Sequence, residues 1–172
     1  MSNVAIITGA GSGLGAETAR RLAKDGAIIA VNDLNPSAAQ AIADEVGGIA
    51  LPFDVVDSSA FDIAVDSCVS QLGRLDILVN NAGRSIRRSI ELSYDRFHDF
   101  ERTMDLNYFG CLRVTMGLLP GMVAKKKGHV VNISSIGVLT NAPRFSAYVA
   151  SKAALDAWTR CASSEYADLG IT

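Results

Sequence analysis

The chain has 172 residues, of which 49% are hydrophobic and 20% charged, and its formal net charge is −2. This length and composition predict one globular domain and exclude a wholly disordered chain. The near-neutral charge offers no general attraction to nucleic acid, and no apolar run approaches the roughly 20 residues of a membrane span. The three cysteines lie far apart without paired spacing, so no disulfide framework or metal site is expected, and reduced thiols favour a cytoplasmic location.

Short apolar runs alternate with amphipathic segments along the chain. The runs typical of buried strands are Asn3–Thr8, Ala27–Asp33, Ile49–Phe53, Leu75–Val79 and His129–Ser134. Helices are expected between them, within residues 14–23, 37–46, 61–72 and 93–125, and again from near Phe145. This order predicts a parallel sheet covered on both faces, which is a doubly wound α/β domain over residues 1–172.

Two of the expected helices show an apolar face. In the first, which Gly26 can terminate, the side chains predicted to face the core are Leu14, Thr18, Ala19, Leu22 and Ala23. In the third, they are Phe61, Val65, Cys68, Val69 and Leu72.

A glycine-rich turn, Thr8-Gly9-Ala10-Gly11-Ser12-Gly13-Leu14-Gly15, lies between the first strand and the first helix. It fits Thr-Gly-x-x-x-Gly-x-Gly better than Gly-x-Gly-x-x-Gly. Glycines at such a place let the backbone turn tightly and approach a pyrophosphate, which sits at the helix N-terminus. The turn therefore predicts a Rossmann-type nucleotide site, although a packing role alone is the alternative. The expected cofactor-binding residues here are Gly9, Ser12, Gly13, Leu14 and Gly15.

Asp33 ends the second expected strand. A carboxylate there can accept hydrogen bonds from both hydroxyls of an adenine ribose, and it repels a 2′-phosphate. Because Leu34 and Asn35 follow it rather than an arginine, the sequence predicts NAD in preference to NADP. The alternative is that Asp33, like Asn35, caps the next helix. Asp54 and Val55 are expected beside the adenine, and Asp54 has the alternative of capping a turn.

A third group of residues lies towards the C-terminal end. Tyr148 and Lys152 are four residues apart and share one helix face. A phenol is a weak base because its ordinary pKa is about 10, and an ammonium beside it favours the phenolate. Ser135 follows a strand, and strand C-terminal ends line the crevice of a parallel sheet. The three side chains are therefore predicted to converge for acid–base catalysis, although a lone Tyr-x-x-x-Lys pair is usually a surface feature.

The sequence resembles the short-chain dehydrogenase/reductase family over all 172 residues. The likeness rests on the glycine turn and on Asn80–Gly83, Asn107, Asn132–Ser135 and the Tyr148/Lys152 pair. It implies hydride transfer between C4 of a nicotinamide and the carbonyl or alcohol carbon of a small-molecule substrate.

The resemblance also implies a role for each catalytic side chain. Tyr148 would act as general acid and base, and Lys152 would bind the nicotinamide ribose and favour the tyrosinate. Ser135 would polarise the substrate oxygen. Asn107 would interrupt its helix and hold a water that relays protons.

Further implications concern the cofactor and the length of the chain. Asn81 would stabilise the central sheet beside the cofactor, and Ala82 and Gly83 would continue the cofactor-binding segment. Family members carry additional strands and a substrate loop, whereas this chain stops at residues 170–172, where the alternation predicts another strand. We therefore expect a C-terminally truncated domain.

A narrower resemblance is to the reductase domain of bacterial fatty acyl-CoA reductases. It rests on residues 84–88, 94–102, 135–139 and 144–148. Arginines among them could pair with coenzyme A phosphates, or they could be ordinary solvated charges. Those enzymes are associated with NADPH, whereas Asp33 favours NAD here.

Two alternatives to a dehydrogenase remain from the sequence. One is a non-catalytic NAD-binding regulatory domain of the same fold, because fold alone does not fix function. The other is a nucleotide-sugar epimerase or dehydratase, which shares a Tyr-x-x-x-Lys pair but more often begins Gly-x-x-Gly-x-x-Gly. The apolar segments Asp105–Ala124 and Phe145–Leu169, whose counterparts pair in the family, predict a homodimer or homotetramer.

Overall fold

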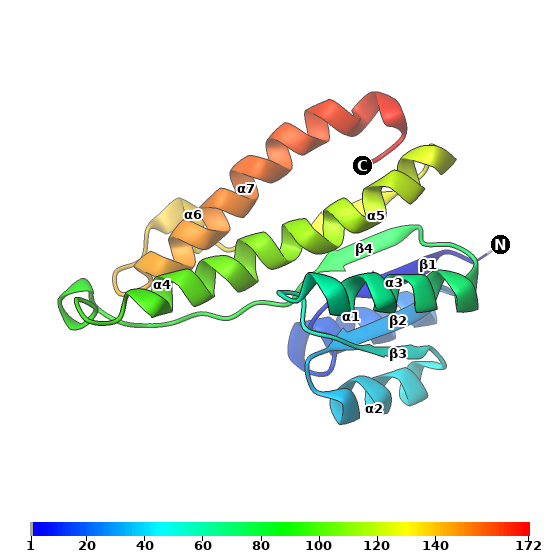
Figure 1. The fold of residues 1–172 in the computed structure, drawn as a ribbon, viewed down its shortest axis with the longest axis horizontal. Helices are drawn as coiled ribbons and strands as arrows, with labels where there is room; N and C mark the ends of the chain where they lie inside the picture. Colours follow the sequence, from blue (N-terminus) through cyan, green and yellow to red (C-terminus); the bar gives the residue numbers. More distant parts are fainter. Residues whose placement is uncertain (1) are drawn as a thin grey trace.

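Five parallel strands form the central sheet of the computed structural model, which describes residues 2–172 and, in α3, leaves out the side chains of residues 58, 60–64 and 67. The strand order is β3-β2-β1-β4-β5 (Figure 1). The strands are β1 (Val4–Ile7), β2 (Ile28–Asp33), β3 (Ile49–Pro52), β4 (Ile77–Asn80) and β5 (His129–Asn132). The order turns back at β1, because β2 and β3 lie on one side of it and β4 and β5 on the other. The expected doubly wound fold is confirmed.

Helices follow the strands in the expected alternation. They are α1 (Gly13–Lys24), α2 (Pro36–Val46), α3 (Ser58–Leu72), α4 (Phe97–Met104), α5 (Cys111–Lys125), α6 (Gly137–Thr140) and α7 (Ser146–Tyr166). Short turns of other helix types are η1 (Ile90–Leu92), η2 (Asp105–Gly110) and η3 (Ala167–Leu169). A π-helical segment, η2, joins α4 to α5 in one long rod, and α7 runs beside that rod (Figure 1).

Successive residues of each strand supply two separate cores, because their side chains point to opposite faces of the sheet. One core combines Val4 and Ile6 of β1 with α3 and α5 side chains such as Cys68 and Val114. The other combines Ala5 and Ile7 of β1 with small or branched side chains of α1 and α2, such as Ala19, Ala39 and Ile42. Burial on both faces explains why the strands read as continuous apolar runs.

Asp76, directly before β4, ties together the starts of three strands. Its Oδ2 accepts a hydrogen bond of 2.9 Å from the N–H of Val4, and its carbonyl accepts one of 2.9 Å from His129. Burial opposes ionisation of this carboxyl, but hydrogen bonds from the Arg74 guanidinium and from Val4 outweigh that effect and hold the pKa of Asp76 below its usual range. An ionised Asp76 therefore fixes the register at this edge.

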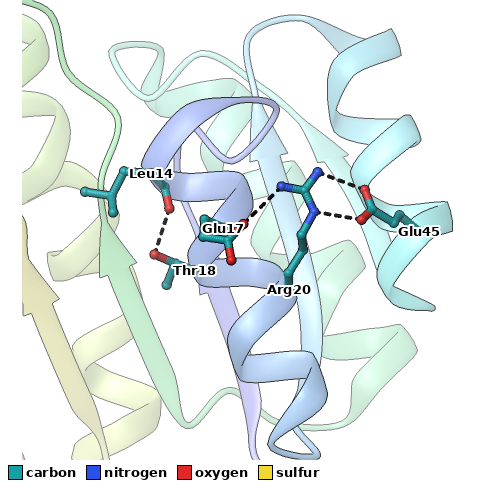
Figure 2. Close-up of polar contacts among 5 residues, drawn as sticks. All are labelled: Leu14, Glu17, Thr18, Arg20 and Glu45. Carbon is teal, nitrogen blue, oxygen red and sulfur yellow. Dashed lines mark hydrogen bonds and ion pairs between the residues drawn. The ribbon is translucent and has the colours of Figure 1, made fainter.

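The first turn of α1 differs from the sequence expectation. Leu14 was predicted to face the core, but it is 60% exposed, whereas Gly15, Ala16 and Ala19 are buried against the sheet. The helix approaches the strands so closely that only small side chains fit between them. Figure 2 shows Leu14 directed away from Arg20, which bridges α1 to Glu45 of α2 with bonds of 2.7 and 2.9 Å.

Two further expectations are adjusted at their edges. Strand β5 ends at Asn132 rather than at Ser134, and the following residues turn into the short helix α6, which the apolar pattern did not indicate. In α3, the expected inward position of Val69 is wrong, because this side chain is 41% exposed, and that of Phe61 lies outside the described residues. At the chain's last residues, Ile171 bridges to Gly128, and Thr172 exchanges backbone hydrogen bonds with Gly128 and Val130 along the outer edge of β5.

Candidate active site

The glycine turn is held in place by the segment that follows β4. Gly9 and Gly13 have φ angles of 62° and 55°, a region that favours glycine. The amide of Asn81 donates to the carbonyls of Thr8 and Gly9 at 2.9 and 3.0 Å. In return, the Thr8 hydroxyl accepts the N–H groups of Asn81 and Ala82, each at 3.0 Å. The two segments therefore form one rigid unit at the carboxyl edge of the sheet.

Asp33 braces the other side of the same turn. Its Oδ2 accepts from the N–H of Gly11 at 2.9 Å, and its Oδ1 accepts from Asn35 at 2.9 Å. The helix-cap alternative is wrong for Asp33, because Asn35 caps α2 by accepting from Ser37 and Ala38. The Asp33 carboxylate therefore lies beside the glycine turn and does not cap α2.

An open cleft of about 360 Å³ runs along the carboxyl ends of the strands. Six of the predicted cofactor-binding residues line it, together with Arg84: Gly9, Asp33, Asp54, Val55, Ala82 and Gly83. Ser12, Gly13, Leu14 and Gly15 are not among the lining residues and form the start of α1 instead. Within the cleft, Asp54 also closes a turn by accepting from Val56 at 3.1 Å. The cleft lining combines the Asp33 carboxylate with glycine backbone that a ligand can approach closely, and both are features of nucleotide sites.

Asn107 lies in the π-helical segment η2 and is fully buried. Its Oδ1 accepts from the N–H of Arg84 at 2.9 Å, and its Nδ2 donates to the carbonyl of Arg84 at 2.9 Å. The same Nδ2 donates to the hydroxyl of Ser151 at 2.9 Å. Asn107 therefore joins the end of the Asn81–Arg84 loop to α7, and π-helical segments are often found at functional sites.

Lys152 is buried to 3% exposure on α7, and its Nζ donates to the carbonyl of Ile133 at 2.6 Å. Burial lowers the pKa of its ammonium below the ordinary value. A Cβ placed on Gly83 would lie 3.6 Å from Lys152 Nζ and 3.0 Å from Asn107 Oδ1. A side chain at position 83 would therefore press against the Asn107 amide at the point where the Asn81–Arg84 loop meets Lys152.

Tyr148 lies one helical turn before Lys152 on α7, and Ser135 lies in the loop after β5. Tyr148 is half-buried with its ring edge-on to Phe145, and Ser135 accepts from the N–H of Gly137 at 3.1 Å. Among the described residues, no hydrogen bond joins the Tyr148 hydroxyl to Ser135. Contacts of this kind often close only around a substrate.

Sequence reasoning missed one residue at this site. Ser151 is fully buried between Tyr148 and Lys152 and bonds Asn107, although it stands inside the Tyr-x-x-x-Lys motif. Arg84, one of the arginines considered in the sequence as a phosphate contact, lines the cleft. A separate cavity of about 190 Å³ between α5, α7 and β5 is lined by none of the predicted site residues.

Comparison with known proteins decides the family. The family described as short chain dehydrogenase matches residues 3–172. The chain belongs to the short-chain dehydrogenase family. It is 52% identical over 167 residues to a fatty acyl-CoA reductase of Acinetobacter baylyi, covering 94% of this chain and 57% of that protein. The chain therefore spans little more than half the length of this relative.

Two solved structures superpose closely on this chain. One is a 3-ketoacyl-(acyl-carrier-protein) reductase from Brucella melitensis complexed with NADH, at 33% identity and a TM-score of 0.92, covering 98% of this chain and 72% of that one. The other is NAD+-bound xylitol dehydrogenase, at 33% identity and a TM-score of 0.90, covering 98% and 66%. Within the part of the chain that the structure describes, no helix is both long and apolar enough to span a membrane.

Proposed function

We propose that the protein carrying this chain transfers a hydride between a nicotinamide cofactor and a carbonyl or alcohol carbon. The observation that carries the proposal is the meeting of Gly83, Asn107 and Lys152 at one end of the cleft that Gly9 and Asp33 line. A bound nicotinamide supplies the hydride acceptor or donor at its C4. The residues of the chain bind it, orient the substrate and move the proton.

Tyr148 is the proposed general acid and base. In alcohol oxidation its phenolate takes the hydroxyl proton while the hydride leaves the carbinol carbon, and in reduction its phenol returns the proton to the forming alkoxide. Ser135 donates a hydrogen bond to the same substrate oxygen. Lys152 stabilises the phenolate electrostatically and donates a hydrogen bond to the ribose. Asn107 interrupts its helix and holds a water molecule that relays protons.

The cofactor is proposed to be NAD, because Asp33 lies at the cleft in the place expected for an adenine ribose partner. We expect NAD(H) to bind at least about tenfold more tightly than NADP(H), which corresponds to about 1.4 kcal/mol. Replacing Asp33 by Ser removes the charge that repels a 2′-phosphate, so the ratio should fall towards one. Calorimetric titration with both cofactors measures this ratio.

Asp44→Ser, an exposed carboxylate change on α2, is the matched control and should leave the cofactor ratio unchanged. Equal affinity of the unaltered protein for the two cofactors would contradict the assignment of Asp33.

The substrate is proposed to be fatty acyl or lipid-derived. The similarity to a fatty acyl-CoA reductase supports this, and so do two exposed apolar side chains beside Ser135, because Ile136 is 71% and Leu139 74% exposed. A long apolar chain would cover such side chains on binding. Homo-oligomeric assembly and a cytoplasmic location stay predictions.

A substrate panel tests the proposed function. Acyl thioesters and aldehydes of short and long chain, together with secondary alcohols, are incubated with NAD(H) and with NADP(H), and nicotinamide absorbance is followed. We expect kcat/KM to rise with chain length by at most about fifteenfold per added pair of methylenes, given an upper bound of about 0.8 kcal/mol per buried CH₂. Cofactor binding without turnover of any of these would favour the regulatory domain instead.

A further inference from the structure

One buried hydroxyl joins the three segments of the site, and the proposed chemistry does not use it. Ser151 has no solvent exposure and lies on α7 between Tyr148 and Lys152. Its Oγ accepts a hydrogen bond of 2.9 Å from Asn107 Nδ2 and donates one of 2.7 Å to the carbonyl of Tyr148. The hydroxyl therefore uses both its donor and its acceptor capacity within the site.

Arg84 and Ser151 share the hydrogen bonds of the Asn107 amide. Arg84 fixes Oδ1 through its N–H and takes one Nδ2 hydrogen on its carbonyl. The second Nδ2 hydrogen points into the protein interior, where Ser151 Oγ is its acceptor. A fully buried amide hydrogen without an acceptor is costly. Removing the Ser151 hydroxyl would therefore favour rotation of the Asn107 amide or a shift of η2.

We propose that Ser151 is a positioning residue, which holds α7 and η2 in register so that Tyr148 and Lys152 face the Gly83–Arg84 loop. The proposal rests on the proposed function for its catalytic consequence. Ser151 does not line the cleft and bonds no reacting group. It acts through Asn107 on one side and through the backbone of Tyr148 on the other.

A double-mutant cycle tests the linkage. Ser151→Ala should lower kcat about tenfold with the KM for the cofactor changed less than about twofold, because misplacement of the base affects turnover before binding. In an Asn107→Ala background, the same substitution should cost less than about twofold, since the partner through which it acts has gone. Additive losses in the two backgrounds would overturn the proposal.

Thr159 provides a matched control on the same helix. Its hydroxyl also accepts from an asparagine amide, Asn132 Nδ2 at 2.9 Å, and also donates to a helix carbonyl, that of Leu155 at 2.7 Å. Thr159→Ala therefore removes the same kind of bond away from the proposed catalytic residues. It should leave kcat within about twofold of the unaltered enzyme and behave additively with Asn107→Ala.

Two additional measurements keep the test decisive. If Ser151→Ala does not fold, Ser151→Cys keeps the volume with a weaker acceptor, and it should show a smaller loss of kcat with the same non-additivity. Amide hydrogen exchange with NAD bound is independent of turnover. Residues 105–110 should exchange faster in the Ser151 variant and not in the Thr159 variant, whereas unchanged exchange would overturn the linkage. A protein that turns over no substrate but shows this exchange pattern would contradict the proposed function alone.

Discussion

Replacing Tyr148 by Phe is expected to reduce kcat at least 10²-fold, which is typical for the loss of a general acid and base. The change removes one hydroxyl and keeps the ring, which packs edge-on against Phe145. That hydroxyl has no hydrogen-bond partner among the residues described, so its removal leaves no buried group unpaired. Stability and NAD affinity should therefore change little. Steady-state kinetics, with calorimetry for NAD binding, measures both.

Tyr166→Phe is the matched control, because Tyr166 ends the same helix and packs against the core on the far side from the proposed site. Its turnover should stay within about twofold of the unaltered enzyme. Near-normal turnover of the Tyr148→Phe variant would contradict the role of Tyr148 as general acid and base. The hypothesis of a non-catalytic NAD-binding regulatory domain would then be favoured.

Replacing Lys152 by Met should lower turnover and weaken cofactor binding together. The substitution keeps an unbranched apolar stem at a position that is only 3% exposed, and it removes only the charged end. We expect kcat to fall at least 10²-fold and the Kd for NAD to rise about tenfold, since the ammonium serves both the phenolate and the ribose. Binding and single-turnover measurements separate the two effects.

Arg160→Met on the same helix is the control for charge. Its guanidinium bonds Asp156 at 2.6 Å on the solvent side and is 74% exposed, so its loss should change neither quantity by more than about twofold. A Lys152→Met variant that binds NAD normally would contradict the ribose assignment, even if its turnover were lost.

Most of the fold was predictable from the sequence, because the apolar runs and amphipathic segments that indicate strands and helices are local and recur along the chain. All five strands overlap predicted apolar runs, and burial on both faces explains the continuous apolar residues of β1, β2 and β4. Leu14 failed as a core prediction because periodicity measures which side chains are apolar, not how close a helix lies to the sheet. At the start of α1 the face against the sheet carries Gly15, Ala16 and Ala19, and Leu14 lies outside that face.

The site was predictable residue by residue but not in its connections. The glycine turn, Asp33 and the Tyr148/Lys152 pair have recognisable spacing within short segments. The Asn107–Ser151 bond joins residues 44 positions apart, and nothing in either residue's neighbourhood indicates the other. Such pairings depend on tertiary packing, which no local pattern encodes.

The bond between Asn81 and Thr8 has a consequence for how the protein folds. These residues are 73 positions apart, and β1 must pair with β4 before the amide of Asn81 can close the glycine turn. Contacts of such long sequence separation form late and slowly, because the intervening chain must first be ordered. A nascent chain ending before residue 81 would thus have the whole glycine motif and still bind nucleotide poorly. Added NAD should favour refolding only after the two halves of the sheet have docked, so nucleotide binding during refolding would report the moment of that docking.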